Sequence, residues 1–591
     1  MTTDQAEMTQ TAEAPPEEGE GTIPLSTGFD RRVMPGWLSR PARVDLIGLS
    51  VLLVVVGFLW GRAASMSFWL DEGIAVGVAS HPLAAVPHLV LQESAPPLYY
   101  LLLHVWESLF GGSNTAVHVL SLLFALATVP AVWWSGRSLF DRRTGWMCAL
   151  VFAINPYIAY YATETRMYSM VLLLAVLSTA TFIHAFVFGR RRYLPWFALS
   201  LALLLYTHNW GLLLGLGAAV ALVPLFLLSG DRRRLVIDAS LGFGAVTVLY
   251  APWVPSILYQ IGQNLQPWGR NADLVLVRNN VFQTLGGNEV LVALGLGAGI
   301  GLAAMLQGKG WTRQAMAVAV LAIIPVVTLV TGWRGSVWAY RYLAVVVGPM
   351  VLLVAVGLAR SGRVGLAALG VAALLTAPLT VRGPAYQKSN VQAVAAQVSP
   401  QLRPGDLVVL PDFQMVPLVA HYLRPGLRYA TTSGLVADPN TVHWRHSMDR
   451  LLNDNPANTL PPLIGALPAG AHLLVMCPPV NQGAATGLAQ DQAAKSQTTA
   501  GPTATTTATT TATTTATTTA PTTNKGTQPK ITPLPPDDPF HPLILLRCQQ
   551  TKDLVAQNVQ LLVGQVLKAP NGVRSTPVDA TLLTKEPSNA P

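Results

Sequence analysis

The sequence predicts an α-helical protein that crosses a membrane about eleven times and carries a small α/β domain in its C-terminal third. Of its 591 residues, 51% are hydrophobic and only 11% are charged, whereas about a quarter of the residues of soluble domains are charged. The apolar residues are gathered into runs close to the roughly 20 residues that a helix needs to cross the hydrocarbon core. After residue 381 the composition becomes that of a soluble domain.

Eleven apolar runs are candidate spans, and together they make a membrane domain over residues 43–381. Two of them are shorter than a full span. The runs cover residues 43–62, 115–136, 146–162, 167–188, 194–207, 211–229, 235–252, 289–307, 314–331, 342–360 and 364–381. Residues 1–42 precede the first run, and their polar, partly acidic composition predicts a disordered cytoplasmic tail rather than a cleavable signal peptide.

Clusters of arginine between the runs predict the orientation. If the first run leaves the cytoplasm, five basic connections lie inside, as expected from the enrichment of Lys and Arg in cytoplasmic loops. These connections contain Arg137, Arg142 and Arg143; Arg190, Arg191 and Arg192; Arg232, Arg233 and Arg234; Lys309 and Arg313; and Arg360 and Arg363. The sequence therefore predicts a protein of the cytoplasmic membrane whose N-terminus is cytoplasmic and whose C-terminal domain is outside.

This orientation requires that residues 96–110 form a helix on the membrane surface. The alternative, a short true span, would invert every later connection and place the arginine clusters outside. The same clusters account for the net charge of +9, so we expect the lipid bilayer, and no nucleic acid, as a partner.

Three carboxylates lie in the first outer connection. Asp71 and Glu72 follow the first run closely, and Glu93 precedes a Pro-Pro pair. Acidic residues so near the hydrocarbon are costly unless they have a function. A carboxylate there can take a proton from an acceptor hydroxyl or hold Mg²⁺ or Mn²⁺. We therefore expect all three to be catalytic, with Asp71 and Glu93 as the candidate metal ligands. The alternative for Asp71 is that it caps a surface helix.

Cationic and aromatic residues occupy the other outer connections. An arginine there can bind a phosphate through two parallel hydrogen bonds. The candidate phosphate-binding residues are Arg166, Arg341, Arg334 and His208, and the candidate substrate-binding residues are Glu164, Tyr168, Tyr99 and Tyr340. The alternatives are an ion pair between Glu164 and Arg166, an interfacial belt of tyrosines and arginine contacts with lipid headgroups.

The order of these motifs resembles that of the GT-C glycosyltransferases, in the branch that contains the protein O-mannosyltransferases and the lipid A aminoarabinose transferase. The resemblance covers about the first 380 residues. It consists of Asp71-Glu72, an acid followed by Pro96-Pro97-Leu98, a basic inner turn after Leu139-Phe140, and Thr163-Glu164-Thr165-Arg166-Met167-Tyr168.

The resemblance implies transfer of mannose or a similar sugar from a polyprenyl phosphate to a protein, glycan or lipid acceptor at the outer face. It implies an inverting displacement in which Asp71 is the base or a metal ligand, and it places Glu93 at the acid of the family's Asp-x-His-Pro-Pro segment. Ala95 replaces the His of that segment, and the Lys of the aminoarabinose transferase is absent. The resemblance therefore does not imply the acceptor of either enzyme for this protein. The alternatives are a transporter or a non-catalytic scaffold that displays the outer domain. Ionisable residues at span ends rather than at the bilayer midplane favour the enzyme.

The soluble C-terminal part is predicted to be an α/β domain built from residues 382–479 and 539–591. Helix-like and strand-like segments alternate in its first part. Residues 480–538 are rich in Thr, Ala and Pro, which predicts a disordered insert, either a plain linker or an O-glycosylated segment. The domain's role is not apparent from its sequence.

Six positions of this domain carry an expectation of their own. Cys477 and Cys548 each end a strand-like apolar run on either side of the insert, so a disulfide between them is expected if the domain is exported. Asp412 and the group His443, Trp444 and His446 are expected to be ordinary surface residues.

Overall fold

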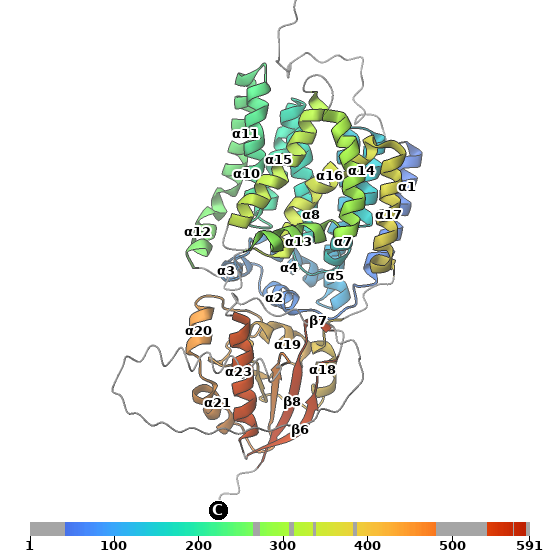
Figure 1. Cartoon of the computed structure of the whole chain (residues 1–591). Coiled ribbons are helices and arrows are strands. Elements are labelled where there is room, and N and C mark those ends of the chain that lie inside the picture. Colours follow the sequence, from blue (N-terminus) through green and yellow to red (C-terminus); the bar gives the residue numbers. More distant parts are fainter. Residues whose placement is uncertain are drawn as a thin grey trace, which may run out of the picture.

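A computed structural model of the chain describes residues 42–263, 272–306, 312–334, 338–381, 387–479, 540–558, 560–570 and 573–586. It consists of a helical bundle followed by a domain with a mixed sheet (Figure 1). The predicted cytoplasmic tail, apart from Ala42, and the Thr-rich insert lie outside the described residues.

Apart from α12, which follows the predicted run 235–252, the bundle helices correspond to the apolar runs of the sequence. They are α1 (Arg43–Gly61), α5 (Asn114–Leu139), α6 (Arg142–Ala153), α7 (Pro156–Tyr161), α8 (Tyr168–Phe182), α9 (Leu194–Leu205), α10 (Gly211–Leu228), α11 (Arg232–Tyr250), α12 (Val254–Gln263), α14 (Asn288–Leu306), α15 (Arg313–Arg334), α16 (Ala344–Arg360) and α17 (Gly362–Val381). In the most apolar stretch of the helix that runs from Tyr168 to Val187, which includes α8, 89% of the residues are buried. In the corresponding stretch of α1 the share is 22%. The centre of the bundle is therefore α8, and α1 lies at its lipid-facing edge.

Eight helices among the described residues are long and apolar enough to cross a membrane, which confirms a multi-pass membrane protein. The other three predicted spans are short or broken. The run 146–162 is divided into α6 and α7 because Asn155 caps a new helix and Pro156 begins it, and Pro lacks the N–H that would continue α6. Helix α9 has 12 residues, and the apolar part of α17 is Gly362–Pro378. The number of spans stays a prediction.

Three short helices cover one end of the bundle and separate it from the C-terminal domain (Figure 1). They are α2 (Leu70–Ala79), α3 (Val86–Gln92) and α4 (Leu98–Phe110). Helix α4, which the sequence predicts on the membrane surface, is not among the candidate spans. His104 of α4 holds it to α2 through a 2.8 Å hydrogen bond between Nδ1 and the carbonyl oxygen of Ala79. Helix α13 (Leu274–Thr284) lies at the same end of the bundle.

The arginine clusters predicted to be cytoplasmic gather at the opposite end of the bundle. Asp45 at the start of α1 pairs with Arg137 at 2.9 Å and Arg142 at 2.7 Å. Arg360 at the end of α16 pairs with Asp141 at 3.2 Å. The clusters thus share one end, as the predicted alternation requires, although the side of the membrane stays a prediction.

The C-terminal domain contains a six-stranded sheet in the order β4-β3-β2-β5-β8-β6. Strands β2 (Leu407–Val409), β3 (Arg428–Thr431) and β5 (His472–Cys477) are parallel, and β4 (Gly434–Leu435), β8 (Asp579–Lys585) and β6 (Leu561–Leu567) join antiparallel. The helices of this domain are α18 (Val391–Val398), α19 (Val416–Tyr422), α20 (Ser447–Asn453), α21 (Pro456–Gly465) and α23 (Phe540–Ala556). Strand β1 (Gln387–Ser389) pairs with β7 (Val573–Thr576). The predicted α/β class of this domain is confirmed.

The expected disulfide is absent from this structure. Cys477 and Cys548 are both free and buried, and the Sγ atom of Cys477 lies 3.9 Å from the carbonyl oxygen of Cys548. Cys477 ends a strand as expected, but Cys548 lies in α23, so its strand-like interpretation is wrong. The buried residues of α23 recur every three or four positions, which is a helical period. The insert is thus flanked by one strand and one helix rather than by two strands.

The domain docks on α2 by close backbone approach. Gly73 of α2 lies against the backbone of Leu418, and Gly77 lies against the carbonyl of Asn440, so neither position has room for a Cβ atom. Two small residues one helical turn apart therefore allow α19 and the segment around Asn440 to lie directly on α2.

Candidate active site

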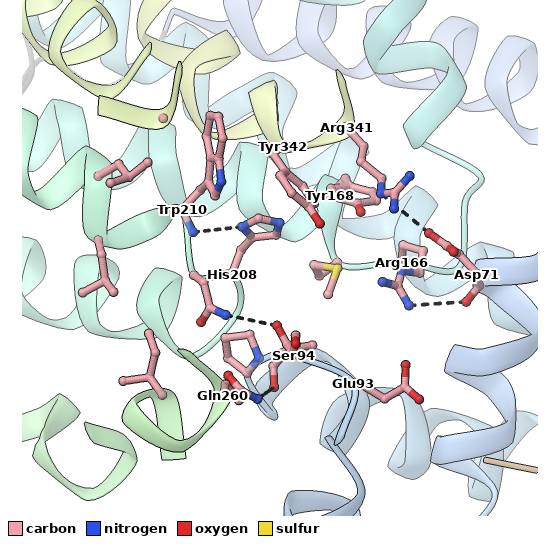
Figure 2. Close-up of a pocket in the computed structure, with 18 of the residues that line it drawn as sticks. Asp71, Glu93, Ser94, Arg166, Tyr168, His208, Trp210, Gln260, Arg341 and Tyr342 are labelled. Carbon is pink, nitrogen blue, oxygen red and sulfur yellow. Dashed lines mark hydrogen bonds and ion pairs between the residues drawn. The ribbon is translucent and has the colours of Figure 1, made fainter. Parts of the chain in front are cut away.

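A cavity of about 380 Å³ lies where the bundle, helices α2 to α4 and the C-terminal domain meet. Figure 2 shows the polar side chains that point into it. Its lining includes six residues that the sequence predicts for the site: Asp71, Glu93, Arg166, Tyr168, His208 and Arg341. The bundle and the connections at this end of it supply all six, so the tertiary structure brings these separate motifs into one site.

Asp71 faces this cavity because its neighbour Glu72 caps the helix instead. The N-cap of α2 is Trp69, and the Trp69 backbone N–H donates a 3.1 Å hydrogen bond to Glu72 Oε2. The carboxylate of Asp71 is therefore not used as a cap. Its Oδ2 lies 3.7 Å from Arg341 Nε, which is an ion pair beyond hydrogen-bond distance.

The two arginines have unused hydrogen-bond donors. Arg166 Nη1 donates to the Tyr100 hydroxyl at 3.1 Å and to the carbonyl oxygen of Asp71 at 3.4 Å. The Nε atoms of Arg166 and Arg341 and the Oδ2 atom of Asp71 are buried without a hydrogen-bond partner. Buried polar atoms in native proteins are nearly always paired, so this group is organised to receive a ligand.

Glu93 is a second carboxylate with a free oxygen. Its Oε2 accepts a 3.1 Å hydrogen bond from Trp444 Nε1, and its Oε1 is buried without a partner. Burial raises the pKa of Glu93 to about 7, despite the hydrogen bond from Trp444. The next residue, Ser94, has a φ of +53°, which is rare for a residue other than Gly. Its carbonyl oxygen is fixed by the side chain of Asn209 at 3.0 Å.

His208 is a neutral hydrogen-bond donor. Its Nδ1 accepts a 3.1 Å hydrogen bond from the backbone N–H of Trp210, so Nε2 carries the proton. Burial, together with the positive charges of Arg166 and Arg341, lowers the pKa of His208 to about 3. The ring also packs against Tyr342, with the ring centroids 4.9 Å apart.

Glu72 belongs to a buried ion cluster rather than to the cavity lining. Its Oε1 accepts hydrogen bonds from Lys388 Nζ at 2.6 Å, His118 Nε2 at 2.8 Å and the Thr165 backbone N–H at 2.8 Å. Burial alone would raise the pKa of Glu72, but Lys388 and His118 hold it at about 2. The cluster ties α2 to α5, to the Arg166 turn and to β1. No local motif marks Lys388, which lies 316 residues from Glu72.

Besides Glu72, four predicted residues do not line the cavity. Glu164 is buried, both of its carboxylate oxygens have no hydrogen-bond partner, and burial together with the charge of Glu72 raises its pKa to about 8. The Tyr99 hydroxyl is hydrogen-bonded to Ser121. The remaining two are Tyr340, which packs against Tyr157, and Arg334, whose guanidinium lies over the ring of Trp333.

Five other polar or aromatic lining residues either adjoin His208 and Arg341 or come from α12 and the C-terminal domain. They are Asn209, Trp210, Gln260, Tyr342 and Trp444. The expectation that Trp444 is a surface residue is wrong, because it is 4% exposed. Asp412 is also buried, which raises its pKa to about 6, whereas His443 and His446 are exposed as expected. The sequence feature that could have predicted the burial of Trp444 is the presence of a large aromatic residue in an otherwise polar segment.

No group of three or more His, Cys, Asp or Glu side chains suited to a metal ion occurs in the part of the chain that the structure describes. Asp71 and Glu93 each offer one unpaired carboxylate oxygen. Arg166 contacts the Asp71 backbone and acts electrostatically on Glu93. A cation held by the two carboxylates would therefore share this space with a guanidinium group.

Comparison with known proteins agrees with this architecture. Residues 94–259 match the family described as dolichyl-phosphate-mannose-protein mannosyltransferase. Among curated protein sequences, none matches this chain. The crystal structure of apo ArnT from Cupriavidus metallidurans is similar, with 15% identity, a TM-score of 0.52 and coverage of 75% of this chain and 95% of that one. The same protein bound to undecaprenyl phosphate gives 16% identity and the same TM-score and coverage.

At this level of identity the structural similarity shows the fold. The protein is a membrane protein of the GT-C glycosyltransferase fold. The segment that contains Arg166, Tyr168 and His208 lies within the part of the chain that is similar to the protein mannosyltransferase family. The predicted fold class is thereby confirmed.

Proposed function

We propose that the protein transfers a sugar from a polyprenyl-phosphate donor to an acceptor hydroxyl in this cavity, at the outer face of the cytoplasmic membrane. The observation that carries the proposal is the group formed by Arg166, Arg341 and Asp71, in which the two arginine Nε atoms and Asp71 Oδ2 are buried without a hydrogen-bond partner among the described residues. Two guanidinium groups beside one carboxylate can receive a phosphate and an attacking hydroxyl at the same point.

The phosphate is held by the cationic side of the cavity. Arg166 and Arg341 supply charged donors, and the neutral His208 supplies an Nε2–H donor. When the bond from the sugar to the phosphate oxygen breaks, that oxygen gains negative charge. Donors fixed in advance around developing charge are usually the largest single contribution to catalysis. Arginine suits this position because its planar group donates to two phosphate oxygens at once.

The isoprenoid chain lies against the apolar wall of the cavity. Leu212, Leu213 and Ile257 line that wall, together with Ile261. Ile261 is 72% exposed, so the wall continues onto the outside of the bundle between α10 and α12. Apolar surface at this depth faces lipid, which lets a long hydrocarbon chain remain in the bilayer while its phosphate reaches the arginines.

Asp71 accepts the proton of the acceptor hydroxyl. The acceptor oxygen forms a bond to the anomeric carbon as the bond to the phosphate oxygen breaks, and the electron pair of that bond leaves with the lipid phosphate. Attack from the face opposite the phosphate inverts the configuration. The sugar is mannose or another hexose or pentose. A divalent cation, Mg²⁺ or Mn²⁺, would be held by Asp71 and Glu93.

Turnover of lipid-linked sugars by membranes that contain the full chain tests the proposal. The membranes are given polyprenyl-phosphate mannose and a panel of other polyprenyl-phosphate hexoses and pentoses, each radiolabelled in the sugar. We expect release of polyprenyl phosphate and a labelled product with at least one donor. If no donor is consumed, the enzyme proposal fails, and solute movement in sealed vesicles without donor turnover would favour a transporter.

The side of the membrane is tested separately. A cysteine replaces Leu83, which is 46% exposed between α2 and α3, and in a matched control a cysteine replaces the exposed Arg233 at the other end of the bundle. A membrane-impermeant thiol reagent added outside intact cells is expected to label Leu83→Cys only. Labelling of Arg233→Cys alone would place the cavity on the cytoplasmic side.

A further inference from the structure

The C-terminal domain reaches the cavity through one side chain. Among the described residues that line the cavity, Trp444 is the only one that follows the last bundle helix. The bundle and its connections supply the rest of the lining, so the contribution of Trp444 shows what the domain adds to the site.

The position of Trp444 is fixed from the domain side. Its indole packs against Phe413, with ring centroids 5.4 Å apart, and against Phe540, at 6.4 Å. Arg450 donates hydrogen bonds to the carbonyl oxygens of His443 and Arg445, the residues on either side of Trp444. Both the backbone and the ring are thus held by the C-terminal domain, while the edge of the indole that carries Nε1 faces the bundle.

Trp444 in turn fixes the carboxylate of Glu93. Its Nε1–H donates to Glu93 Oε2 at 3.1 Å, and the neighbouring His443 Nδ1 lies 2.5 Å from Gln92 Oε1. With one oxygen bound, the other oxygen, Oε1, is held in a set direction and has no hydrogen-bond partner although it is buried. A buried carboxylate oxygen without a donor is costly, and a hydroxyl of a bound molecule would remove that cost.

The acceptor, rather than the donor, fits beside Glu93. A phosphate is attracted to Arg166 and Arg341 and repelled by a carboxylate. In Figure 2, Glu93 lies on the other side of Arg166 from Arg341. Since Asp71 takes the proton of the attacking hydroxyl, Glu93 is available for a second hydroxyl of the same acceptor. Neighbouring hydroxyls and an aromatic wall are the features of a sugar acceptor.

A second cavity lies in the C-terminal domain, next to the segment that contains Trp444. It has a volume of about 350 Å³, and Val442 and His443 are in its lining, so the segment of Trp444 separates it from the first cavity. Thr432 and Ser433 also line it, and both donate hydrogen bonds to Asp454. Hydroxyls and a carboxylate around an open volume suit further sugar units of a longer glycan.

Resting on the proposed function, we propose that the acceptor is a glycan and that Glu93 and Trp444 bind its terminal sugar. Glu93 Oε1 accepts a hydrogen bond from a hydroxyl next to the attacking one. Trp444 is a positioning residue that orients Glu93 and forms the wall of the acceptor site. The C-terminal domain is therefore a part of the active site.

Three variants of the full chain in nanodiscs test this inference. Trp444→Phe keeps the aromatic wall and removes the N–H donor, and Glu93→Gln keeps the size of the side chain and removes the charge. Trp333→Phe is the matched control, because Trp333 Nε1 also donates a hydrogen bond, to Ala272, but the residue does not line the cavity. Thermal unfolding of each variant shows whether it is folded.

The first measurement is binding of an octyl disaccharide glycoside, which needs no donor turnover. We expect Trp444→Phe and Glu93→Gln to weaken binding about tenfold, which corresponds to the loss of about one hydrogen bond at 1.4 kcal/mol per factor of ten, and Trp333→Phe to bind as wild type does. The inference is overturned if wild type does not bind the glycoside, or if all four proteins bind it equally.

The second measurement compares transfer with cleavage of the donor by water. The KM for the disaccharide glycoside is expected to rise in Trp444→Phe and Glu93→Gln, and the ratio of transfer to donor cleavage by water is expected to fall in both variants. Equal loss of transfer and cleavage would instead assign Glu93 to the donor. Equal loss with octanol or a Ser/Thr peptide as acceptor would show that no second sugar hydroxyl is recognised. Absence of donor cleavage in wild type contradicts the proposed function alone.

Discussion

Two clusters of aspartate and arginine lie at opposite ends of the bundle and use the same residue types differently. Asp45 receives three hydrogen bonds, from Arg137 at 2.9 Å, Arg142 at 2.7 Å and Trp146 at 2.9 Å. Asp71 lies 3.7 Å from Arg341, and its Oδ2 receives no hydrogen bond. The first cluster is complete within the protein, and the second is complete only with a ligand.

The comparison distinguishes charged residues that stabilise the fold, around Asp45, from charged residues that are available to a ligand, around Asp71. A buried charge is costly unless it is paired and hydrogen-bonded. Around Asp45 the pairing is internal, and it fixes the ends of α1, α5 and α6 against one another. Around Asp71 the Oδ2 atom has no hydrogen-bond partner within the protein, and a phosphate together with a hydroxyl would supply one. The predictions below set variants of the two clusters against each other.

The largest effect is expected for the aspartates. Asp71→Asn should lower sugar transfer at least about 100-fold, because the proton acceptor is lost, with little change in thermal unfolding. Asp45→Asn should keep the activity per folded molecule but lower the free energy of unfolding by about 3 kcal/mol, since it removes the charged partner of Arg137, whose side chain is 12% exposed. Turnover and thermal unfolding in one detergent measure both, and the opposite pattern would invert the assignment of the clusters.

The arginines are expected to show the next largest effect. Arg166→Lys and Arg341→Lys keep the charge but lose the second parallel hydrogen bond to phosphate. We expect kcat/KM for the donor to fall about 10- to 100-fold, the equivalent of one hydrogen bond to a charged group. Arg142→Lys, at the opposite end, is the control and should transfer sugar like wild type. Equal effects at both ends would argue against a phosphate site at Arg166 and Arg341.

The pH dependence of acceptor use follows from Glu93. Burial raises its pKa to about 7, so the carboxylate is protonated below that pH and loses its charge. We expect kcat/KM for the acceptor to fall as the pH decreases below 7 and to level off about tenfold lower, at the level of Glu93→Gln. Glu93→Gln should remove this limb of the profile while lowering its plateau. A limb that persists in Glu93→Gln would belong to another group.

Removal of divalent cations is expected to have the smallest effect. Arg166 and Arg341 already supply positive charge to the phosphate, and a guanidinium group lies near both candidate ligands. We therefore expect a chelator to change turnover by less than about threefold, far below the loss typical of enzymes that depend on a catalytic metal. A much larger loss, reversed by Mg²⁺ or Mn²⁺, would show that Asp71 and Glu93 hold a cation.

The sequence alone determined the membrane class, the basic end of the bundle, the α/β domain and six residues of the cavity. These follow from local patterns, because the bilayer forces span ends into two planes and so brings motifs such as Asp71, Arg166 and His208 to one level. In a membrane protein the order of the spans therefore already shows which connections lie at the same end, whereas in a soluble protein the tertiary structure is needed to show this.

Only the tertiary structure separated Asp71 from Glu72 and added Lys388 and Trp444. Adjacent helical residues point about 100° apart, so one carboxylate faces the cavity and the other the core, and no sequence pattern shows which. Trp444 reaches the cavity, and Lys388 reaches the Glu72 cluster, because the C-terminal domain docks on α2 at Gly73 and Gly77. Contacts between segments more than 300 residues apart depend on how two surfaces pack, and packing leaves no local period in the sequence.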